Sequence, residues 1–215
     1  MKPILFNEEM VRALLSGQKT ATRRVVKPIP PENARLELIG DRRHAMDLSI
    51  EIPGPDDHRI YTPPYLPSDI LYVRETFACD GFDGEKEVYV YRADVDECDR
   101  IVWGDIEKKE WAPSSDYHWH PSIHMPKEAA RLFLRVTDVR VERLQEITDE
   151  GAKAEGANNG IGVSNKMRET AIQRFQRIWN STIKPTVLST YGWDANPWVW
   201  VIEFERCENP DERSL

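Results

Sequence analysis

Apolar residues recur at helical spacing near the N-terminus of the chain. A short strand is expected at Ile4–Phe6, after which Asn7 can cap a helix with Glu8 and Glu9 in its first turn. The apolar face of this helix is formed by Met10, Val11, Leu14 and Leu15. Gly17 is predicted to end the helix in a left-handed conformation.

Two further helices are predicted in the C-terminal half of the chain. Thr148 can cap a short helix that stops at Gly156. A longer amphipathic helix is indicated by apolar side chains at Met167, Ala171, Phe175, Ile178 and Trp179.

Alternating or β-rich runs predict four main strands, which are Asp69–Phe77, Val88–Arg92, Leu132–Leu144 and Trp198–Glu205. In Leu132–Leu144 the apolar positions change from even to odd near Thr137-Asp138, which predicts a bulge or bend. The last strand is expected to present one apolar face, made of Trp198, Trp200, Ile202 and Phe204.

Because the predicted strands are short, outnumber the helices and are separated by Pro and Gly turns, we expect an α+β fold built on a small β-barrel with flanking helices. One domain is expected over residues 1–207, with loop insertions at about 28–67 and 80–124. The first insertion is rich in proline and is expected to hold one hairpin around Leu36–Ile52. Residues 208–215 are polar and are expected to form a flexible tail.

Composition narrows the classes of function. The 215 residues carry a net charge of -8, which argues against a protein that coats duplex nucleic acid. The charge is uneven, with nine basic and five acidic residues in 1–43 but five basic and twelve acidic residues in 80–116. No apolar run approaches the length of a membrane helix, no signal peptide is evident, and the three cysteines are widely spaced. We therefore expect a cytoplasmic protein without a membrane partner.

The segment that follows Gly17 concentrates groups with chemical potential. It reads Gly17-x-Lys19-Thr20-x-Thr22-x-Arg24, and Arg23 adds a second guanidinium. A threonine hydroxyl becomes a nucleophile when a base takes its proton, and a lysine can be that base when burial or a cationic neighbour lowers its pKa. If the segment is extended, Thr20, Thr22 and Arg24 share one face, and Lys19 and Arg23 share the other. A turn at Lys19 could instead bring its amine beside Thr22. The alternative is an ordinary solvated basic strand.

Glu155 lies at the expected end of the short helix. The negative end of the helix dipole disfavours a charged carboxylate there, which would help Glu155 to donate a proton to a leaving amine. The alternative is an exposed glutamate in a frayed last turn.

A cluster of aromatic and histidine residues lies within the acidic insertion, at Tyr117, His118, Trp119, His120 and His124. The spacing of these histidines and of Cys79 and Cys98 is poor for zinc, so no metal is predicted. Trp119 and His120 could instead form a stacking wall for a planar base, or could pack within the loop. Arg74 and Glu75 could bind substrate or form a cross-strand ion pair.

With these residues in view, the chain resembles the ASCH domain family of the PUA-like superfamily. The segment Leu14–Arg24 looks like the family's helix end and Gly-x-Lys-Thr-x-Thr-x-Arg motif, and Thr148–Gly156 looks like the short helix that bears its glutamate. Ser68–Val73 looks like its Gly-Asp-x-Leu-x-Val strand, with Ser68 where glycine is usual. The layout is similar to that of ASCH proteins found in phages and prophages.

The resemblance implies a PUA-like barrel and two kinds of activity. Some members are amidohydrolases that remove an acyl group from the exocyclic amine of N(4)-acylated cytosine nucleosides such as N(4)-acetylcytidine. Their Lys, Thr and Glu fall on Lys19, Thr22 and Glu155, and the reaction uses no metal or other cofactor. Other members are proposed RNA binders or ribonucleases. Expected partners are therefore a small nucleoside or, alternatively, single-stranded RNA. The residues expected to contact substrate are Thr20, Arg23, Arg24, Arg74, Glu75, Trp119 and His124.

Overall fold

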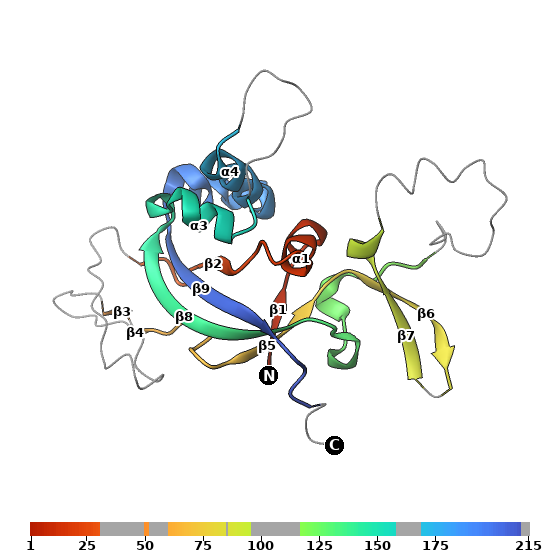
Figure 1. Ribbon diagram of the computed structural model, residues 1–215. Helices are drawn as coiled ribbons and strands as arrows, with labels where there is room; N and C mark the ends of the chain where they lie inside the picture. The colour runs from red at the N-terminus through yellow and green to blue at the C-terminus, as the bar shows by residue number, and fades with distance from the viewer. Residues whose placement is uncertain (31–49, 52–59, 85, 96–116, 158–168, 212–215) are drawn as a thin grey trace, which may run out of the picture. The chain divides into compact units, whose positions relative to one another are not determined.

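The computed structural model describes residues 1–30, 50–51, 60–84, 86–95, 117–157 and 169–211 (Figure 1). Within these ranges the fold is mixed α+β, as predicted from the sequence. The strands are β1 (Lys2–Leu5), β2 (Ala21–Val25), β3 (Ile50–Glu51), β4 (Ile60–Tyr61), β5 (Ile70–Arg74), β6 (Phe77–Asp83), β7 (Lys86–Tyr91), β8 (Phe133–Arg143) and β9 (Trp198–Cys207). The helices are α1 (Glu8–Leu15), α3 (Asp149–Ala154), α4 (Ala171–Thr182) and α5 (Leu188–Tyr191).

Five of these strands form one sheet, in the order β1-β5-β8-β9-β2. Strands β1 and β2 end this order, so the pairing of the described strands does not close into the predicted barrel. The pairs β3-β4 and β6-β7 form two separate antiparallel sheets. The hairpin expected around Leu36–Ile52 lies mostly outside the described residues, but Ile50 at its end pairs with Tyr61.

Contacts divide the chain into two compact units. The first comprises Met1–Ser16, Leu71–Leu134 and Arg206–Leu215, and the second comprises Gly17–Ile70 and Arg135–Glu205. Each unit is therefore assembled from segments that are distant in sequence.

In the first unit, β1 runs parallel to β5, with Ile4 opposite Val73 and both buried. The predicted helix is present as α1, because the Asn7 side chain accepts a hydrogen bond of 2.9 Å from the Met10 N–H. Val11 and Leu14 are fully buried on its inner face, whereas Leu15, which was predicted to share that face, is exposed.

The strand predicted over Asp69–Phe77 is wrong as a single element, because β5 ends at Arg74 and β6 begins at Phe77. Between them Glu75 is buried, and its N–H points to the sulfur of Met125 at 3.1 Å rather than to a neighbouring strand. Phe77 then exchanges backbone hydrogen bonds with His120. The chain thus changes its pairing partner across these two residues.

In the second unit, β2 runs antiparallel to β9, with Thr22 opposite Ile202. Along β8, Val136 and Val139 are buried while the two residues between them are exposed, which confirms the predicted change of phase at 137–138. Figure 1 shows β8 as a curved strand.

The hydrophobic core of the second unit lies where α3 and α4 pack with β9 (Figure 1). The predicted cap of α3 is present, because Thr148 accepts from the Gly151 N–H, and at α4 Thr170 forms a reciprocal capping box with Gln173. Met167, an apolar residue of the predicted longer helix, lies outside the described residues, and α4 begins at Ala171. The core contains Leu144, Ile147, Ala152, Ala157, Ala171, Phe175, Trp179, Val199 and Val201.

Strand β9 is buried on both faces in its middle. The predicted face of alternating aromatic and aliphatic residues is present, but Val199 and Val201 on the opposite face are also 0% exposed. Their burial follows from α4, which covers the face that the alternating pattern left unassigned.

Candidate functional site

The segment after Gly17 leads directly into β2 and pairs through its backbone with the end of α3. All three lie in the second unit. Lys19 forms an isolated antiparallel bridge with Glu155, and the Thr20 N–H donates to the Ala154 carbonyl at 2.8 Å. The Phe204 N–H in β9 donates to the Thr20 carbonyl at 2.9 Å. These backbone bonds bring together residues that are 136 positions apart in sequence.

The side chains of Lys19 and Glu155 form a buried ion pair. The Lys19 Nζ donates to Glu155 Oε2 at 2.6 Å and to the Glu155 backbone carbonyl at 2.9 Å. The lysine side chain is 0% exposed and the glutamate side chain 5%. As predicted, Glu155 is the C-terminal cap of α3, and Gly156 follows in a left-handed conformation with φ 91°.

Arg23 is the second cation at this carboxylate. Its Nη1 donates to Glu155 Oε1 at 3.4 Å, and its Nη2 donates to Glu142 Oε2 at 3.3 Å. The guanidinium carbon lies 5.7 Å from the centre of the Phe175 ring in α4. The expectation that Lys19 and Arg23 share one face is therefore confirmed, because both reach Glu155.

Burial dominates the protonation of Lys19. It lowers the pKa of the amine from its ordinary value, Glu155 opposes this effect, and the positive charges of Arg24 and Arg23 add to it. A lysine with a lowered pKa can exist as a neutral amine at a smaller cost than a solvated lysine, which is the property a general base requires.

Arg24 extends the positive field of the site. Its Nη1 donates to the Arg23 carbonyl at 3.4 Å. Burial lowers the pKa of Arg24, while the negative charge of Glu155 and the phenol of Tyr65 raise it. Burial likewise raises the pKa of Tyr65, and Arg24 lowers it. Arg24 and Tyr65 are thus electrostatic neighbours beside the ion pair.

Thr22 lies in β2, next to Arg23. It is 1% exposed and pairs with Ile202 in the sheet. The hydrogen bonds described above connect Lys19, Arg23 and Glu155. Thr20 is exposed, and its backbone rather than its side chain makes the bonds described above.

Sequence reasoning missed Glu142 and Tyr65. Glu142 in β8 alternates with the valines of that strand, so its side chain lies on the same face as that of Arg140, which donates to it at 2.5 Å. A carboxylate within a β-rich run is the signal that could have singled it out. Tyr65 follows two prolines in a loop, where no local pattern distinguishes it.

The other predicted substrate contacts lie in the first unit. Glu75 is not paired with Arg74: its two oxygens accept from Arg131 at 2.9 and 3.0 Å, and Arg131 also binds Asp94. Arg74 donates to the Ile123 carbonyl. Glu75 therefore takes part in an ion pair, which was one of the two expected alternatives, but its partner Arg131 lies just before β8 rather than in a strand.

Trp119 and His120, the predicted aromatic wall, contact other side chains of the first unit. The Arg92 guanidinium lies 5.1 Å from the centre of the Trp119 ring, and Tyr117 meets that ring edge-on. His120 packs on Phe77, and His124 ends a short 3-10 turn. Cys98 lies outside the described residues, and across the described ranges no three His, Cys, Asp or Glu residues are grouped to hold a metal ion.

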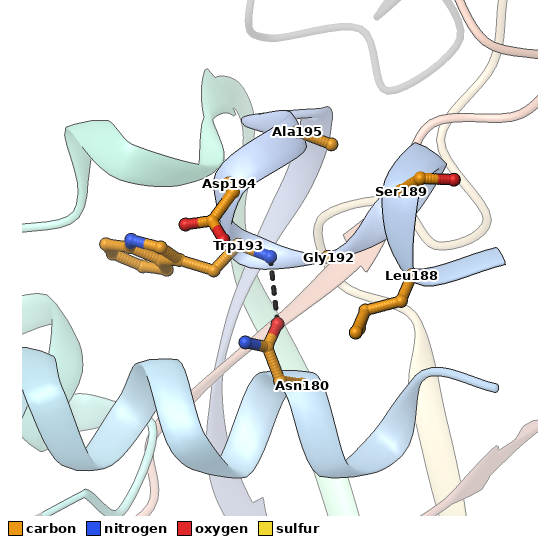
Figure 2. Close-up of a pocket in the computed structure, with 7 residues that line it drawn as sticks. All are labelled: Asn180, Leu188, Ser189, Gly192, Trp193, Asp194 and Ala195. Carbon is orange, nitrogen blue, oxygen red and sulfur yellow. Dashed lines mark hydrogen bonds between the residues drawn. The ribbon is translucent and has the colours of Figure 1, made fainter. Parts of the chain in front are cut away.

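Two pockets lie elsewhere in the second unit. One, of about 300 Å³, is lined by α4, α5 and the segment after α5. Figure 2 shows the Asn180 side chain there, which accepts a hydrogen bond from the Trp193 N–H; the two atoms are 2.9 Å apart. A second, of about 480 Å³, is lined partly by Arg143, Asn196 and Trp198. Neither pocket is lined by Lys19 or Glu155. The candidate site is therefore the buried ion pair itself.

A scan against protein-family models, a search of curated proteins and a search of solved structures each found no match. None of the described helices combines the length and the apolar character that crossing a membrane requires. The resemblance to the ASCH family accordingly stays a prediction from the residues quoted above.

Proposed function

We propose that this chain is a metal-independent amidohydrolase that removes an acyl group from the exocyclic amine of N(4)-acylated cytosine nucleosides. The observation that carries the proposal is the buried hydrogen bond of 2.6 Å between Lys19 and Glu155. A PUA-like barrel that encloses the substrate belongs to the same proposal, and the mixed α+β fold is compatible with it.

The ion pair supplies an acid and a base from one proton transfer. Movement of a proton from the Lys19 ammonium to Glu155 Oε2 yields a neutral amine and a carboxylic acid. Burial lowers the pKa of Lys19, which favours the neutral amine that this transfer produces. The amine is then ready to accept a proton, and the acid is ready to donate one.

In the proposed reaction, Lys19 takes the hydroxyl proton of Thr22 while the Thr22 oxygen attacks the acyl carbon. The bond to the exocyclic nitrogen breaks as Glu155 protonates that nitrogen, which releases the cytosine nucleoside. This leaves an acyl ester on Thr22, an ammonium and a carboxylate. After the same proton transfer, the neutral Lys19 amine takes a proton from water as the water oxygen attacks the ester carbon. Lys19 then gives that proton to the Thr22 oxygen as the ester bond breaks, which releases the carboxylic acid and restores the threonine hydroxyl. In this proposal Arg24 stabilises negative charge on the acyl oxygen in both steps.

The experiment measures cytidine released from N(4)-acetylcytidine by chromatography. Lys19→Met and Glu155→Gln are expected to lower kcat by about 10²- to 10⁴-fold, the range of general acid–base catalysis. Thr22→Val should abolish release, whereas Thr22→Ser should retain it. Lys153→Met is the matched control, since Lys153 pairs with Asp149 on the exposed side of α3. Absence of release by the wild-type chain, or release by Thr22→Val at the wild-type rate, would contradict the proposal.

A second candidate function is binding of RNA or a modified nucleotide without chemistry. It is favoured by the three cations gathered at residues 19–24, which are Lys19, Arg23 and Arg24. Binding of a short single-stranded RNA should then weaken with salt and with Arg24→Gln, with no turnover. Cleavage of that RNA during long incubation would indicate a ribonuclease instead.

A further inference from the structure

The two oxygens of Glu155 have different partners. Oε2 accepts from the Lys19 amine at 2.6 Å, and Oε1 accepts from Arg23 Nη1 at 3.4 Å. A guanidinium stays protonated throughout the accessible pH range, so it can donate to Oε1 but cannot exchange its proton. A proton that arrives at this carboxylate therefore belongs on Oε2, the oxygen that faces Lys19.

Arg23 itself is held on several sides. Its side chain is 2% exposed, and Glu142 binds Nη2 at 3.3 Å. A Cβ atom added to Gly151 of α3 would lie 3.2 Å from the same Nη2, so the backbone of α3 closes on the guanidinium. The Phe175 ring borders it from α4.

Glu142 is fixed in turn from the surface of β8. Its Oε1 accepts from Arg140 Nε at 2.5 Å, and Arg140 also binds Glu203 of β9. The side chains of Arg140, Glu142, Arg23 and Glu155 therefore contact one another in this order and alternate in charge. Arg140 is half-exposed and Glu155 is buried. This arrangement restrains the orientation of Glu155 from the side opposite Lys19.

We propose that Arg23 is a positioning residue, an inference that rests on the proposed function. Glu142 holds Arg23 in place, and Arg23 restrains Glu155 so that this carboxylate exchanges its proton with Lys19 through Oε2 alone. Arg23 acts through Glu155 and does not contact substrate. This role differs from simple packing, because it depends on a positively charged donor at Oε1. Lysine at position 23 keeps the positive charge, whereas glutamine removes it.

The test compares Arg23→Gln, Arg23→Lys and Glu142→Gln with Arg135→Gln, a matched control whose arginine pairs with exposed Glu205. For cytidine release, Arg23→Gln is expected to lower kcat about 10- to 100-fold with KM within twofold, and Arg23→Lys to restore part of the loss. Glu142→Gln keeps Arg23 and should give a smaller loss of kcat. A raised KM at unchanged kcat, or equal losses in Arg23→Gln and Arg23→Lys, overturns the proposal.

A second readout does not depend on activity. In protein carrying 13C at lysine Cε, NMR follows the titration of Lys19. Because the charge of Arg23 contributes to the lowered pKa of Lys19, Arg23→Gln should raise that pKa, Arg23→Lys should raise it less, and the control should leave it unchanged. The acidic limb of the pH–rate profile should move to higher pH in the same order. An unchanged Lys19 titration in folded Arg23→Gln overturns the proposal even if the wild-type chain releases no cytidine.

Discussion

Replacement of Glu155 by glutamine should destabilise the protein in a way that depends strongly on pH. Glu155→Gln keeps the shape of the side chain and an oxygen for Arg23, but it leaves the fully buried Lys19 ammonium without a counter-ion. Removal of one partner from a buried ion pair costs about 3–5 kcal/mol. That is a large part of the stability of a typical domain.

Deprotonation of Lys19 sets an upper limit to this cost. From an ordinary pKa of 10.5, loss of the proton costs about 1.4 kcal/mol per pH unit, which amounts to about 5 kcal/mol at pH 7 and less than about 1 kcal/mol at pH 10. Without Glu155 to oppose burial, the pKa of Lys19 in the folded variant falls further. The unfolded chain then binds more protons than the folded chain up to pH 10.5, so the unfolding free energy of the variant must rise with pH over this interval.

Urea unfolding followed by tryptophan fluorescence at pH 7 and pH 10 measures this difference. Glu155→Gln is expected to lose about 3–5 kcal/mol relative to wild type at pH 7 and at most about 1 kcal/mol at pH 10. Glu205→Gln, on an exposed pair, serves as the control and should change stability by less than about 1 kcal/mol at both pH values. An equal penalty for Glu155→Gln at the two pH values would refute the reasoning, because the stranded charge of Lys19 would not be its source.

Three further outcomes are expected. For wild-type cytidine release, kcat/KM should increase with pH through a midpoint below 10.5, the ordinary lysine value, because the lowered pKa of Lys19 governs the amount of free amine. Arg131→Gln should cost about 3–4 kcal/mol in urea unfolding at pH 7 but only about 1 kcal/mol at pH 5, because burial raises the pKa of Glu75 and a protonated Glu75 needs no counter-ion. An equal loss at both pH values would contradict this. Gly192→Ala should lower the unfolding free energy by about 1–3 kcal/mol in the same assay, because its Cβ would lie 2.5 Å from the Leu188 carbonyl oxygen. If the variant were as stable as wild type, the backbone around Gly192 would have to shift without cost, which would contradict this prediction.

The features that sequence predicted well depend on neighbouring residues. Asn7 and Thr148 cap their helices, and Gly17 and Gly156 adopt left-handed conformations, because each of these roles is decided within about four residues. The change of phase in β8 is equally local, since it follows from side-chain alternation along one strand.

The features that sequence did not predict depend on distant partners. Glu75 leaves the strand because Arg131 and Met125, which are 56 and 50 positions away along the chain, provide its contacts. Arg23 looked like one of several basic residues, and only the approach of Glu142 and Glu155 gives it a separate role. Convergence of Lys19 with Glu155 was expected from the resemblance, whereas no spacing rule alone could place two residues from different ends of the chain against each other.

The distance along the chain between Lys19 and Glu155 has a consequence for folding. A contact across 136 positions requires closure of a long loop, so the entropy of closing it must be offset before the ion pair can form. During refolding, local helices can therefore appear while the lysine is still solvated and titrates normally. Recovery of a low-pKa amine would then mark the completion of tertiary structure, later than the return of helical circular dichroism.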